Sequence, residues 1–426
     1  MKMILSLLTL QFVFTSFHVL GKQTESPNVV MILSDDQGYA DYGFMGHSII
    51  ETPHLDLLAA ESLRFERGYV TTALCSSSLS TMLTGLYPHE HGTTGNDPLR
   101  GISRAPWIEK FEKSPQLPAI LAKKGYLTLH TGKYWHGKPS RSGFTHDMGD
   151  TKRHGSAFSL SIGRNTMEPI YNFIEEAEEK KKPFFVWYAP FLPHTPHNPP
   201  AELEKKYQKL GAGGQSKYFA MCEWFDQSCG QLLDYLDEKK LEENTLVVYA
   251  CDNGWGSLKG IKGSVKASPY ELGVRTPIMF RWPNRISPEV NKVDLASNLD
   301  LVPTILRACG LDPKPRMQGI DLLDRKAVSK RDALFLENFT HDMLDANRPE
   351  AALRARSIVL RDWKLTLWRN TDRRLRTQGW QIEIPEQRVE LFNLTNDPEE
   401  SQNLAQKNPE VLTRLTARVN HWWNPK

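Results

Sequence analysis

The 426-residue sequence has little cysteine and almost no net charge. Its 53 Lys and Arg residues nearly balance its 50 Asp and Glu residues, which leaves a formal charge of +3. Proteins that bind nucleic acid usually carry a clear basic excess, so nucleic acid is not expected as a partner. Five cysteines are too few, and odd in number, for a disulfide scaffold. One cysteine therefore needs an explanation of its own.

Long hydrophobic runs are also missing once the first 20 residues are passed. Lys2 precedes an apolar stretch over residues 3–17, and the small residue Gly21 follows it. This pattern is typical of a secretory signal peptide, here residues 1–21. The alternative is a membrane anchor, but the stretch is shorter than the roughly 20 apolar residues that a span needs. We therefore predict an exported protein, periplasmic or extracellular, with no membrane span.

Strand-like and helix-like segments alternate over the first 300 residues. Apolar runs at residues 28–34, 126–131, 184–189 and 245–250 each end in polar residues. Residues 218–236 repeat apolar side chains at helical spacing, and a second helix is expected from Ser114-Pro115 to Gly125. This order predicts an α/β fold with a largely parallel central sheet flanked by helices. Ligands of such sheets bind outside the carboxyl ends of the strands, which is where the polar residues fall.

The pattern changes after residue 324. Short strand-like runs at residues 333–336, 357–360, 364–368 and 389–392 precede a helical stretch at 409–423. We predict an α/β domain over residues 22–324 and a smaller α+β subdomain over residues 325–426, built of antiparallel strands and a terminal helix. Trp422 and Trp423 are expected to anchor that helix rather than to bind a ligand.

Several acidic residues follow the predicted strands. Asp35 and Asp36 come after the first, and Asp252 and Asn253 come after the fourth. Such an all-oxygen set suits a hard divalent cation, Ca²⁺ or Mg²⁺, better than zinc. Paired acids at a strand end are otherwise often caps and turn formers, so the pair Asp35-Asp36 alone does not decide between these alternatives.

Cys75 stands before three serines at the predicted start of a helix. Free backbone N–H groups at a helix start favour an anion and lower the pKa of a thiol, which predicts a reactive cysteine. The alternative is a buried structural cysteine before a serine-capped helix, and spacing alone favours that alternative.

The residues around Cys75 resemble the type I sulfatase family of the alkaline phosphatase superfamily, whose signature is C-x-P-S-R-x-x-x-L-T-G. The sequence matches this signature at Cys75, Ser78 and Leu83-Thr84-Gly85. Six further segments resemble family motifs, and together they extend the resemblance over about residues 28–405. These segments are residues 35–38, 131–133, 190–196, 252–255, 266–277 and 390–404.

The resemblance implies a set of ligands and a modified nucleophile. A maturation enzyme would oxidise Cys75 to formylglycine, whose hydrated gem-diol attacks sulfur and later expels sulfate by collapsing to the aldehyde. The cation would be Ca²⁺ in preference to Mg²⁺. Its ligands would be Asp35, Asp36, Asp252, Asn253 and the residue at position 75.

The resemblance also implies roles for lysines and histidines. Lys133 and Lys266 would neutralise sulfate oxygens, His136 would act as the base near the diol, and His194 would hold the sulfate or protonate the leaving oxygen. From loop position alone, His91, His197 and Trp255 are expected at the rim, where they would contact a sulfated carbohydrate. Either lysine could instead be an ordinary surface lysine of a loop.

Two signature positions depart from the family. Its proline is Ser77 here, and its arginine, which assists cysteine maturation, is Leu79. We hypothesise that Cys75 is still converted, because the lysines, acids and histidines are all retained. Three functions follow, of which the first is preferred. They are a secreted Ca²⁺-dependent sulfatase, a phosphodiester or phosphonate monoester hydrolase of the same superfamily, and a non-catalytic protein that binds sulfated glycans.

Overall fold

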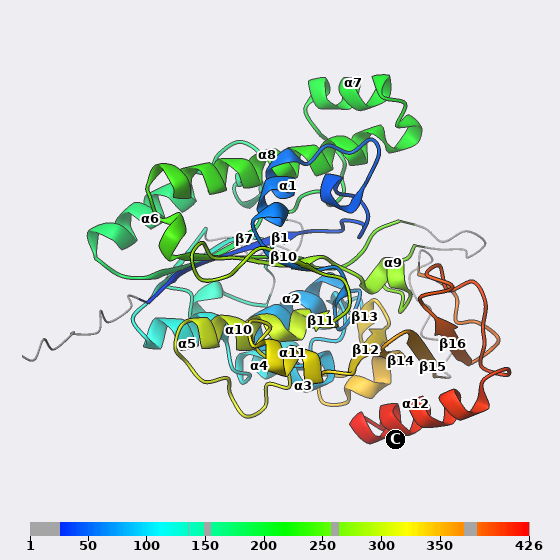
Figure 1. Ribbon diagram of the computed structural model, residues 1–426. Coiled ribbons are helices and arrows are strands. Elements are labelled where there is room, and N and C mark those ends of the chain that lie inside the picture. Colours follow the sequence, from blue (N-terminus) through cyan, green and yellow to red (C-terminus); the bar gives the residue numbers. More distant parts are fainter. Residues whose placement is uncertain (1–25, 135, 149–154, 257–263, 370–380, 426) are drawn as a thin grey trace, which may run out of the picture.

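The computed structural model describes residues 26–134, 136–148, 155–256, 264–369 and 381–425 (Figure 1). The predicted signal peptide, residues 1–21, lies outside the described residues. In the part of the chain that is described, no helix is both long enough and apolar enough to cross a membrane.

The core of the molecule is an eight-stranded sheet. Its central strands β8, β1, β7 and β5 run parallel, and β9 pairs antiparallel with β8 and β2. The order is β10 (Glu289–Asn291), β2 (Leu63–Phe65), β9 (Ile278–Arg281), β8 (Thr245–Cys251), β1 (Asn28–Ser34), β7 (Phe184–Ala189), β5 (Leu127–Gly132) and β6 (His146–Asp147).

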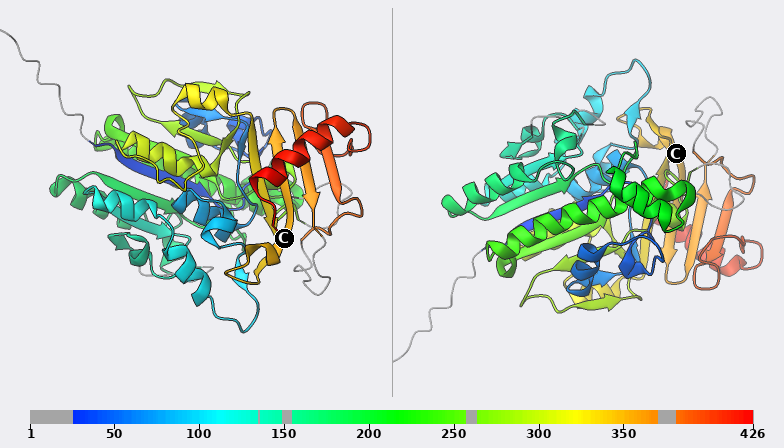
Figure 2. Two further views of the ribbon diagram at one scale, coloured as in Figure 1. Left: turned by 90° about the horizontal axis from the view of Figure 1, so that it is seen from below. Right: turned by 90° about the horizontal axis from the view of Figure 1, so that it is seen from above.

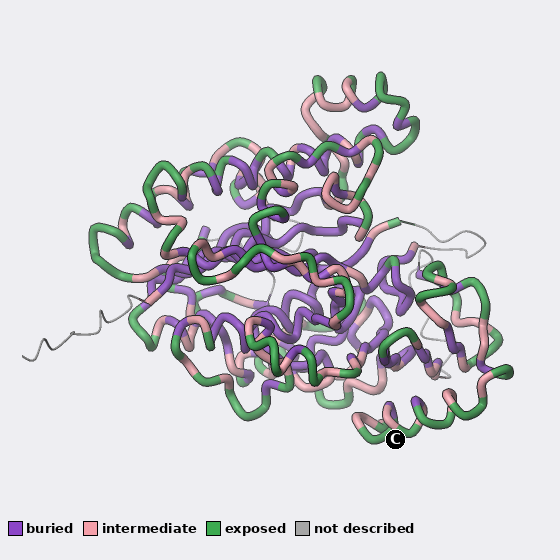
Figure 3. The backbone as a smooth tube through the Cα atoms, in the orientation of Figure 1, coloured by how far each residue is buried: buried purple, intermediate pink, exposed green. Residues whose placement is uncertain are grey.

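Helices cover both faces of this sheet (Figures 1 and 2). Val30 and Ile32 of β1 pack on the face of α1 (Pro53–Ala60), α6 (Glu168–Glu179) and α8 (Ser216–Glu238). Val29 and Met31 pack on the face of α2 (Cys75–Thr84), α5 (Leu117–Lys123) and α10 (Leu301–Ala308). All seven residues of β1 are buried, as expected of a strand covered on both sides (Figure 3).

The remaining helices and strands around the large sheet are short. They are β3 (Gly68–Tyr69), α3 (Pro88–His91), β4 (Asp97–Pro98), α4 (Ala105–Glu112), α7 (Ala201–Lys209), α9 (Glu271–Val274), β11 (Ala296–Ser297) and α11 (Arg325–Lys330), with 3-10 turns η1 (Gly43–Met45), η2 (Pro139–Ser142), η3 (Ser159–Ser161), η4 (Gly213–Gln215), η5 (Glu242–Asn244) and η6 (Asn298–Asp300).

The carboxyl-terminal part is a second, antiparallel sheet. Its order is β12 (Ala333–Phe339), β14 (Leu353–Leu360), β15 (Trp363–Trp368) and β16 (Val389–Asn393). The terminal helix α12 (Pro409–Trp422) packs Leu415 and Val419 on this sheet. This region also contains the 3-10 turn η7 (Pro349–Ala352). Of its described strands, only β13 (Asp342–Met343) lies outside the second sheet, and it pairs with β4.

The predicted fold class is confirmed, and four predicted strands of the large sheet match β1, β5, β7 and β8 within one residue at each end. One helix start was wrong. The expected cap Ser114-Pro115 does not begin a helix; α5 begins at Leu117, with Pro118 in its first turn. Proline suits this position because its missing N–H would have no intrahelical partner there.

Aromatic contacts attach the end of the chain. Trp422 stacks on Phe335 with ring centroids 4.7 Å apart, and Trp423 stacks on His89 at 4.3 Å. Both tryptophans thus contact other parts of the protein, as expected for anchoring residues.

Candidate active site

The carboxyl ends of three parallel strands bring most of the predicted polar residues together. Asp35 and Asp36 follow β1, Asp252 and Asn253 follow β8, and Lys133 follows β5. Backbone hydrogen bonds extend the ladder beyond the strands: the N–H of Asp252 donates to Ser34, and that of Lys133 donates to Ala189. The sheet therefore fixes these side chains at one edge, although Asp36 and Asn253, for example, are 217 positions apart in sequence.

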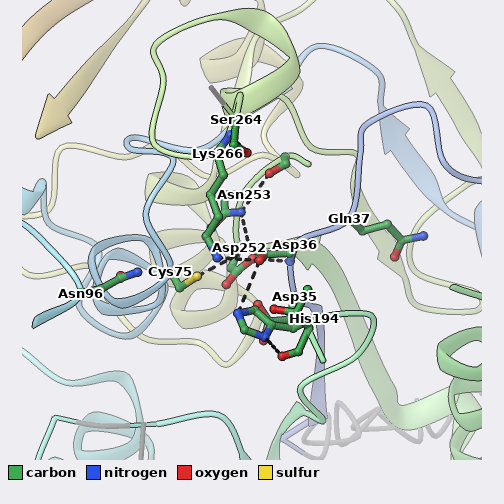
Figure 4. A network of polar contacts seen from close by, with 12 residues as sticks. Asp35, Asp36, Gln37, Cys75, Asn96, His194, Asp252, Asn253, Ser264 and Lys266 are labelled. Carbon is green, nitrogen blue, oxygen red and sulfur yellow. Dashed lines mark hydrogen bonds and ion pairs between the residues drawn. The ribbon is translucent and has the colours of Figure 1, made fainter. Parts of the chain in front are cut away.

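Four potential ligands form one buried cluster. A carboxylate oxygen of Asp35, Asp36 and Asp252 and the sulfur of Cys75 all lie within 4.8 Å of one another. The backbone N–H of Asp36 donates to Oδ1 of Asp252 at 3.1 Å, and Nδ2 of Asn253 donates to Oδ1 of Asp36 at 2.7 Å. Figure 4 shows these side chains converging on Asp36.

Two buried lysines neutralise the cluster from different sides. Nζ of Lys133 donates to Asp35 and, at 3.1 Å, to Oδ2 of Asp252. Nζ of Lys266 donates to Oδ2 of Asp36 at 2.5 Å. Neither lysine is the surface residue considered as an alternative, because Lys133 is 2% exposed and Lys266 is 8% exposed.

Burial and opposite charges compete in this cluster. Burial raises the pKa of Asp252 to about 6, although Lys133 acts in the opposite direction. Burial also acts to raise the pKa of Asp36, yet Lys266 and His194 hold the pKa of this carboxyl well below its usual range. Burial opposes the charged form of Lys133, but the carboxylates of Asp252 and Asp35 raise its pKa well above the ordinary value. The site therefore keeps strong charges of both signs out of water.

Two oxygen atoms of the cluster suit a cation. Among the described residues, Oδ2 of Asp35 and Oδ1 of Asn253 are buried and accept no hydrogen bond. Buried oxygen atoms normally have a partner, and leaving one without a partner is costly. Carboxylate and amide oxygens are the atoms that Ca²⁺ and Mg²⁺ prefer. The residues present therefore fit a hard divalent cation.

Cys75 is the first residue of α2, as predicted. Its sulfur lies 3.7 Å from Oδ1 of Asp36, and the N–H of the next residue, Ser76, donates to Oδ1 of Asn96 at 3.0 Å. The expected lowering of the thiol pKa was wrong. Burial raises the pKa of Cys75 well above its usual value and the Asp252 carboxylate adds to this, so that the helix start does not decide it. The other four cysteines are buried and unpaired.

His194 lies next to the cluster, and two of the predicted rim residues pack against each other. Nε2 of His194 is 3.5 Å from Oδ2 of Asp36, and its side chain is 14% exposed. Burial lowers the pKa of His194 to about 3, against the effect of Asp36. His197 and Trp255 are half-buried, and their rings lie edge to face with centroids 5.9 Å apart. They pack with Tyr218 of α8.

His136 and His91 both lie against α2. Nε2 of His136 is 3.1 Å from Oγ of Ser80, and burial lowers the pKa of His136 to about 3. The predicted role of His136 as a base stays a prediction. The placement of His91 at a rim was wrong, because its side chain is fully buried and bonds Oγ1 of Thr81 and the N–H of Thr93. The expectation rested on loop position, whereas the residue ends the short helix α3.

The two departures from the family signature have different surroundings. Leu79 is 2% exposed and belongs to the apolar core between α2 and the sheet. Ser77 is fully buried, and within the described residues its hydroxyl has no hydrogen-bond partner. Position 79 is thus occupied by a side chain that packs in the core.

No sequence pattern pointed to Asn96, which accepts a hydrogen bond from the backbone N–H of Ser76, next to Cys75. It lies in a loop 20 residues further along the chain, in no motif of its own. The carbonyl of His341, in the carboxyl-terminal part, accepts from the N–H of Asn96. Only the folded chain brings these three segments together.

Family models match almost the whole described chain. The model called Sulfatase matches residues 27–311, and that of the N-sulphoglucosamine sulphohydrolase C-terminal region matches residues 266–423. The chain belongs to the sulfatase family. This is a family of sulfuric ester hydrolases, so both the predicted family and the predicted enzyme class are confirmed.

Individual relatives agree with this assignment. Human arylsulfatase A is 30% identical over 360 residues, which cover 70% of this chain and 67% of the relative. Human N-acetylglucosamine-6-sulfatase is 26% identical over 93% of this chain and 84% of the relative. The crystal structure of Ps i-CgsB has the same fold, with a TM-score of 0.74, 23% identity and 94% of each chain covered.

Proposed function

We propose that this member of the sulfatase family hydrolyses a sulfate ester of a carbohydrate, with the residue at position 75 as the nucleophile. One observation carries the proposal. Three carboxylates and two lysines, all buried, surround the start of α2 where Cys75 lies. This arrangement offers a cation site and positive charge to one tetrahedral anion.

The cation that we propose is Ca²⁺. Asp35, Asp36, Asp252 and Asn253 would hold it, together with the residue at position 75. Ca²⁺ accepts irregular sets of oxygen ligands, whereas Mg²⁺ demands near-octahedral geometry, so this cluster favours Ca²⁺. When bound, the cation would acidify a hydroxyl at position 75 and withdraw charge from the sulfate.

We further propose that a maturation enzyme converts Cys75 to formylglycine. The support is the sequence around Cys75 and its position facing Asp36 at the start of α2. The departure at Leu79 does not touch this arrangement, since the leucine packs in the core. Conversion of Cys75 without the family's arginine is part of this proposal.

The remaining residues act on charge and protons. Lys133 and Lys266 already bind anionic oxygens in the structure, and sulfate oxygens would take part of that role in the complex. Charge that grows on sulfate in the transition state would be stabilised by these fixed ammonium groups. His194 lies beside Asp36 of the cluster and would hold the sulfate or protonate the leaving oxygen. His136 would serve as the base near position 75.

A carbohydrate substrate is supported by the rim and by a relative. The half-buried rings of His197 and Trp255 pack on the buried Tyr218, and aromatic rings with a few polar groups suit a sugar. One relative is an N-acetylglucosamine-6-sulfatase.

We also propose export through the leader at residues 1–21.

Sulfate release from a panel of defined sulfated mono- and disaccharides tests the function, with phosphate mono- and diesters in parallel. We expect release from at least one sulfated sugar, no release by Cys75→Ala, and unchanged release by Cys309→Ala, which removes a buried thiol outside the site. Faster hydrolysis of the phosphate esters would favour the phosphodiester or phosphonate hydrolase. Sugar binding without any release would favour the non-catalytic protein.

Intact mass of the purified protein tests the nucleophile separately. We expect the mass of the aldehyde or its hydrate at position 75. An active preparation in which Cys75 is a free, alkylatable thiol would overturn the formylglycine proposal.

A further inference from the structure

The segment of residues 190–198, named here the His194 loop, leads from β7 toward α7 and carries both His194 and His197. Its beginning is tied to the cluster, because the carbonyl of Leu192 accepts from the N–H of Asp35 at 2.9 Å. Beyond His194 the loop lies at the surface, with Thr195 and Asn198 exposed. The loop must nevertheless hold His194 at one position relative to Asp36.

The loop begins in a backbone conformation that needs support. Phe191 has a φ of 57°, in the left-handed region that residues other than glycine rarely adopt. Such a conformation persists only where the surroundings hold it. The N–H of Phe191 donates to the carbonyl of Ala189 at 3.0 Å. The carbonyl of Phe191 needs a partner from elsewhere.

Arg164 supplies this partner and reaches both ends of the loop. Its Nη2 donates to the carbonyl of Phe191 at 3.0 Å, and its Nη1 donates to Oδ1 of Asn198 at 3.0 Å. The guanidinium also lies over the ring of Trp224, 5.3 Å from the centroid, on α8. Arg164 thus joins the second and the ninth residue after β7 to helix α8 through one planar group.

The charge of Arg164 is also felt at the cluster. Burial lowers the pKa of the guanidinium, and the carboxylate of Asp35 acts in the opposite direction. The adjacent Gly163 leaves no room for a side chain, because a Cβ there would meet the hydroxyl of Tyr188 at 2.3 Å. The backbone next to Arg164 therefore packs against the side chains of Tyr188 in β7 and Pro190 in the loop.

We propose that Arg164 is a positioning residue that fixes His194 against Asp36 by holding the two ends of the His194 loop. The inference rests on the proposed function, in which His194 acts on the sulfate or its leaving oxygen. A lysine could not replace Arg164 fully, since only the planar guanidinium offers two donors in a fixed fork.

The first test follows the loop itself and needs no substrate. Hydrogen exchange measured by mass spectrometry should show faster exchange of the amides of residues 191–198 in Arg164→Ala than in the unaltered protein, with α6 and α8 unchanged. Arg164→Lys should lie between the two. Arg141→Ala, which removes an exposed arginine paired with Glu112, is the matched control and should leave the loop unchanged. Equal exchange in Arg164→Ala and the unaltered protein would overturn the proposal.

The second test is a double-mutant cycle with the sulfated sugar found in the panel. Arg164→Ala should lower kcat by roughly 10- to 100-fold, because a displacement of about 1 Å can cost that much. Adding Arg164→Ala to His194→Ala should cost little more than His194→Ala alone, since both changes remove the same function. Additive losses would assign Arg164 a general structural role and overturn the inference. If the unaltered protein releases no sulfate at all, the proposed function fails, while the exchange measurement still decides the role of Arg164 in the loop.

Discussion

Nζ of Lys266 lies 2.5 Å from Oδ2 of Asp36, and both side chains are buried. The two residues are 230 positions apart in sequence, and Lys266 reaches the cluster from the segment that precedes α9. A buried carboxylate without a counter-charge is strongly destabilised. The lysine therefore serves the folded protein as well as the anion that the site is proposed to bind.

Replacing Lys266 should reduce both activity and stability. We expect Lys266→Ala to lower kcat/KM for sulfate release by about 100-fold or more, because a fixed donor to the transition state is lost. Without added cation, the free energy of unfolding should fall by about 3–5 kcal/mol, since the change removes the lysine that compensates the buried Asp36 carboxylate. Lys292→Ala removes an exposed lysine and should change neither quantity. Unchanged kcat/KM in Lys266→Ala would remove this lysine from the proposed mechanism.

Removing the cation should abolish sulfate release reversibly. Three carboxylates lie in one buried cluster, so a divalent cation that binds them stabilises the folded state and raises the Tm with concentration. We expect dialysis against EDTA to stop the reaction and lower the Tm, and Ca²⁺ to restore both at lower concentration than Mg²⁺. Sulfate release that survives complete chelation, measured with residual metal analysis, would contradict a cation-dependent reaction.

Sequence patterns predicted the parts of the site that sit on regular strands. Asp35, Asp252 and Lys133 each follow a buried apolar run, and parallel strands bring such positions to one edge. The misplacement of His91 and the unnoticed contribution of Asn96 have a common cause. Both residues lie beyond α2 in short or irregular segments, where spacing does not say which way a side chain faces. The prediction of a lowered pKa for the Cys75 thiol was wrong for another reason, because burial outweighs the effect of the helix start on this pKa.

Restoring the family's arginine at position 79 should destabilise this chain. Leu79 packs in the core with 2% of its surface exposed, so an arginine there would bring an unpaired charge into an apolar region. We expect Leu79→Arg to lower the free energy of unfolding by about 3 kcal/mol or more. Leu79→Met keeps the volume and should cost less than about 1.5 kcal/mol. Denaturant unfolding of both variants measures the difference. Equal stability of the arginine variant and the unaltered protein would mean that the side chain reaches a polar environment, and would place position 79 at the site.

A buried acid outside the active site should make stability depend on pH. Asp226 of α8 accepts hydrogen bonds from the N–H groups of Leu55 and His54 at the start of α1. Burial raises its pKa to about 7 from the ordinary value of 3.8, although both backbone donors oppose the shift. The folded protein therefore keeps a proton between these two values that the unfolded chain has released.

This difference in bound protons fixes the sign of the effect. Where the folded state binds more protons, the free energy of unfolding falls as the pH rises, here through the interval from about 4 to about 7. Asp226→Asn keeps an acceptor for α1 but cannot ionise, so it should flatten this part of the pH profile and raise stability at neutral pH by an amount on the order of 1–3 kcal/mol. Asp234→Asn changes an exposed acid on the same helix and should leave the profile unaltered. Denaturant unfolding between pH 4 and 7 measures both profiles. Equal slopes for Asp226→Asn and the unaltered protein would mean that Asp226 is ionised in the folded protein. The two backbone donors would then outweigh the effect of burial on its pKa.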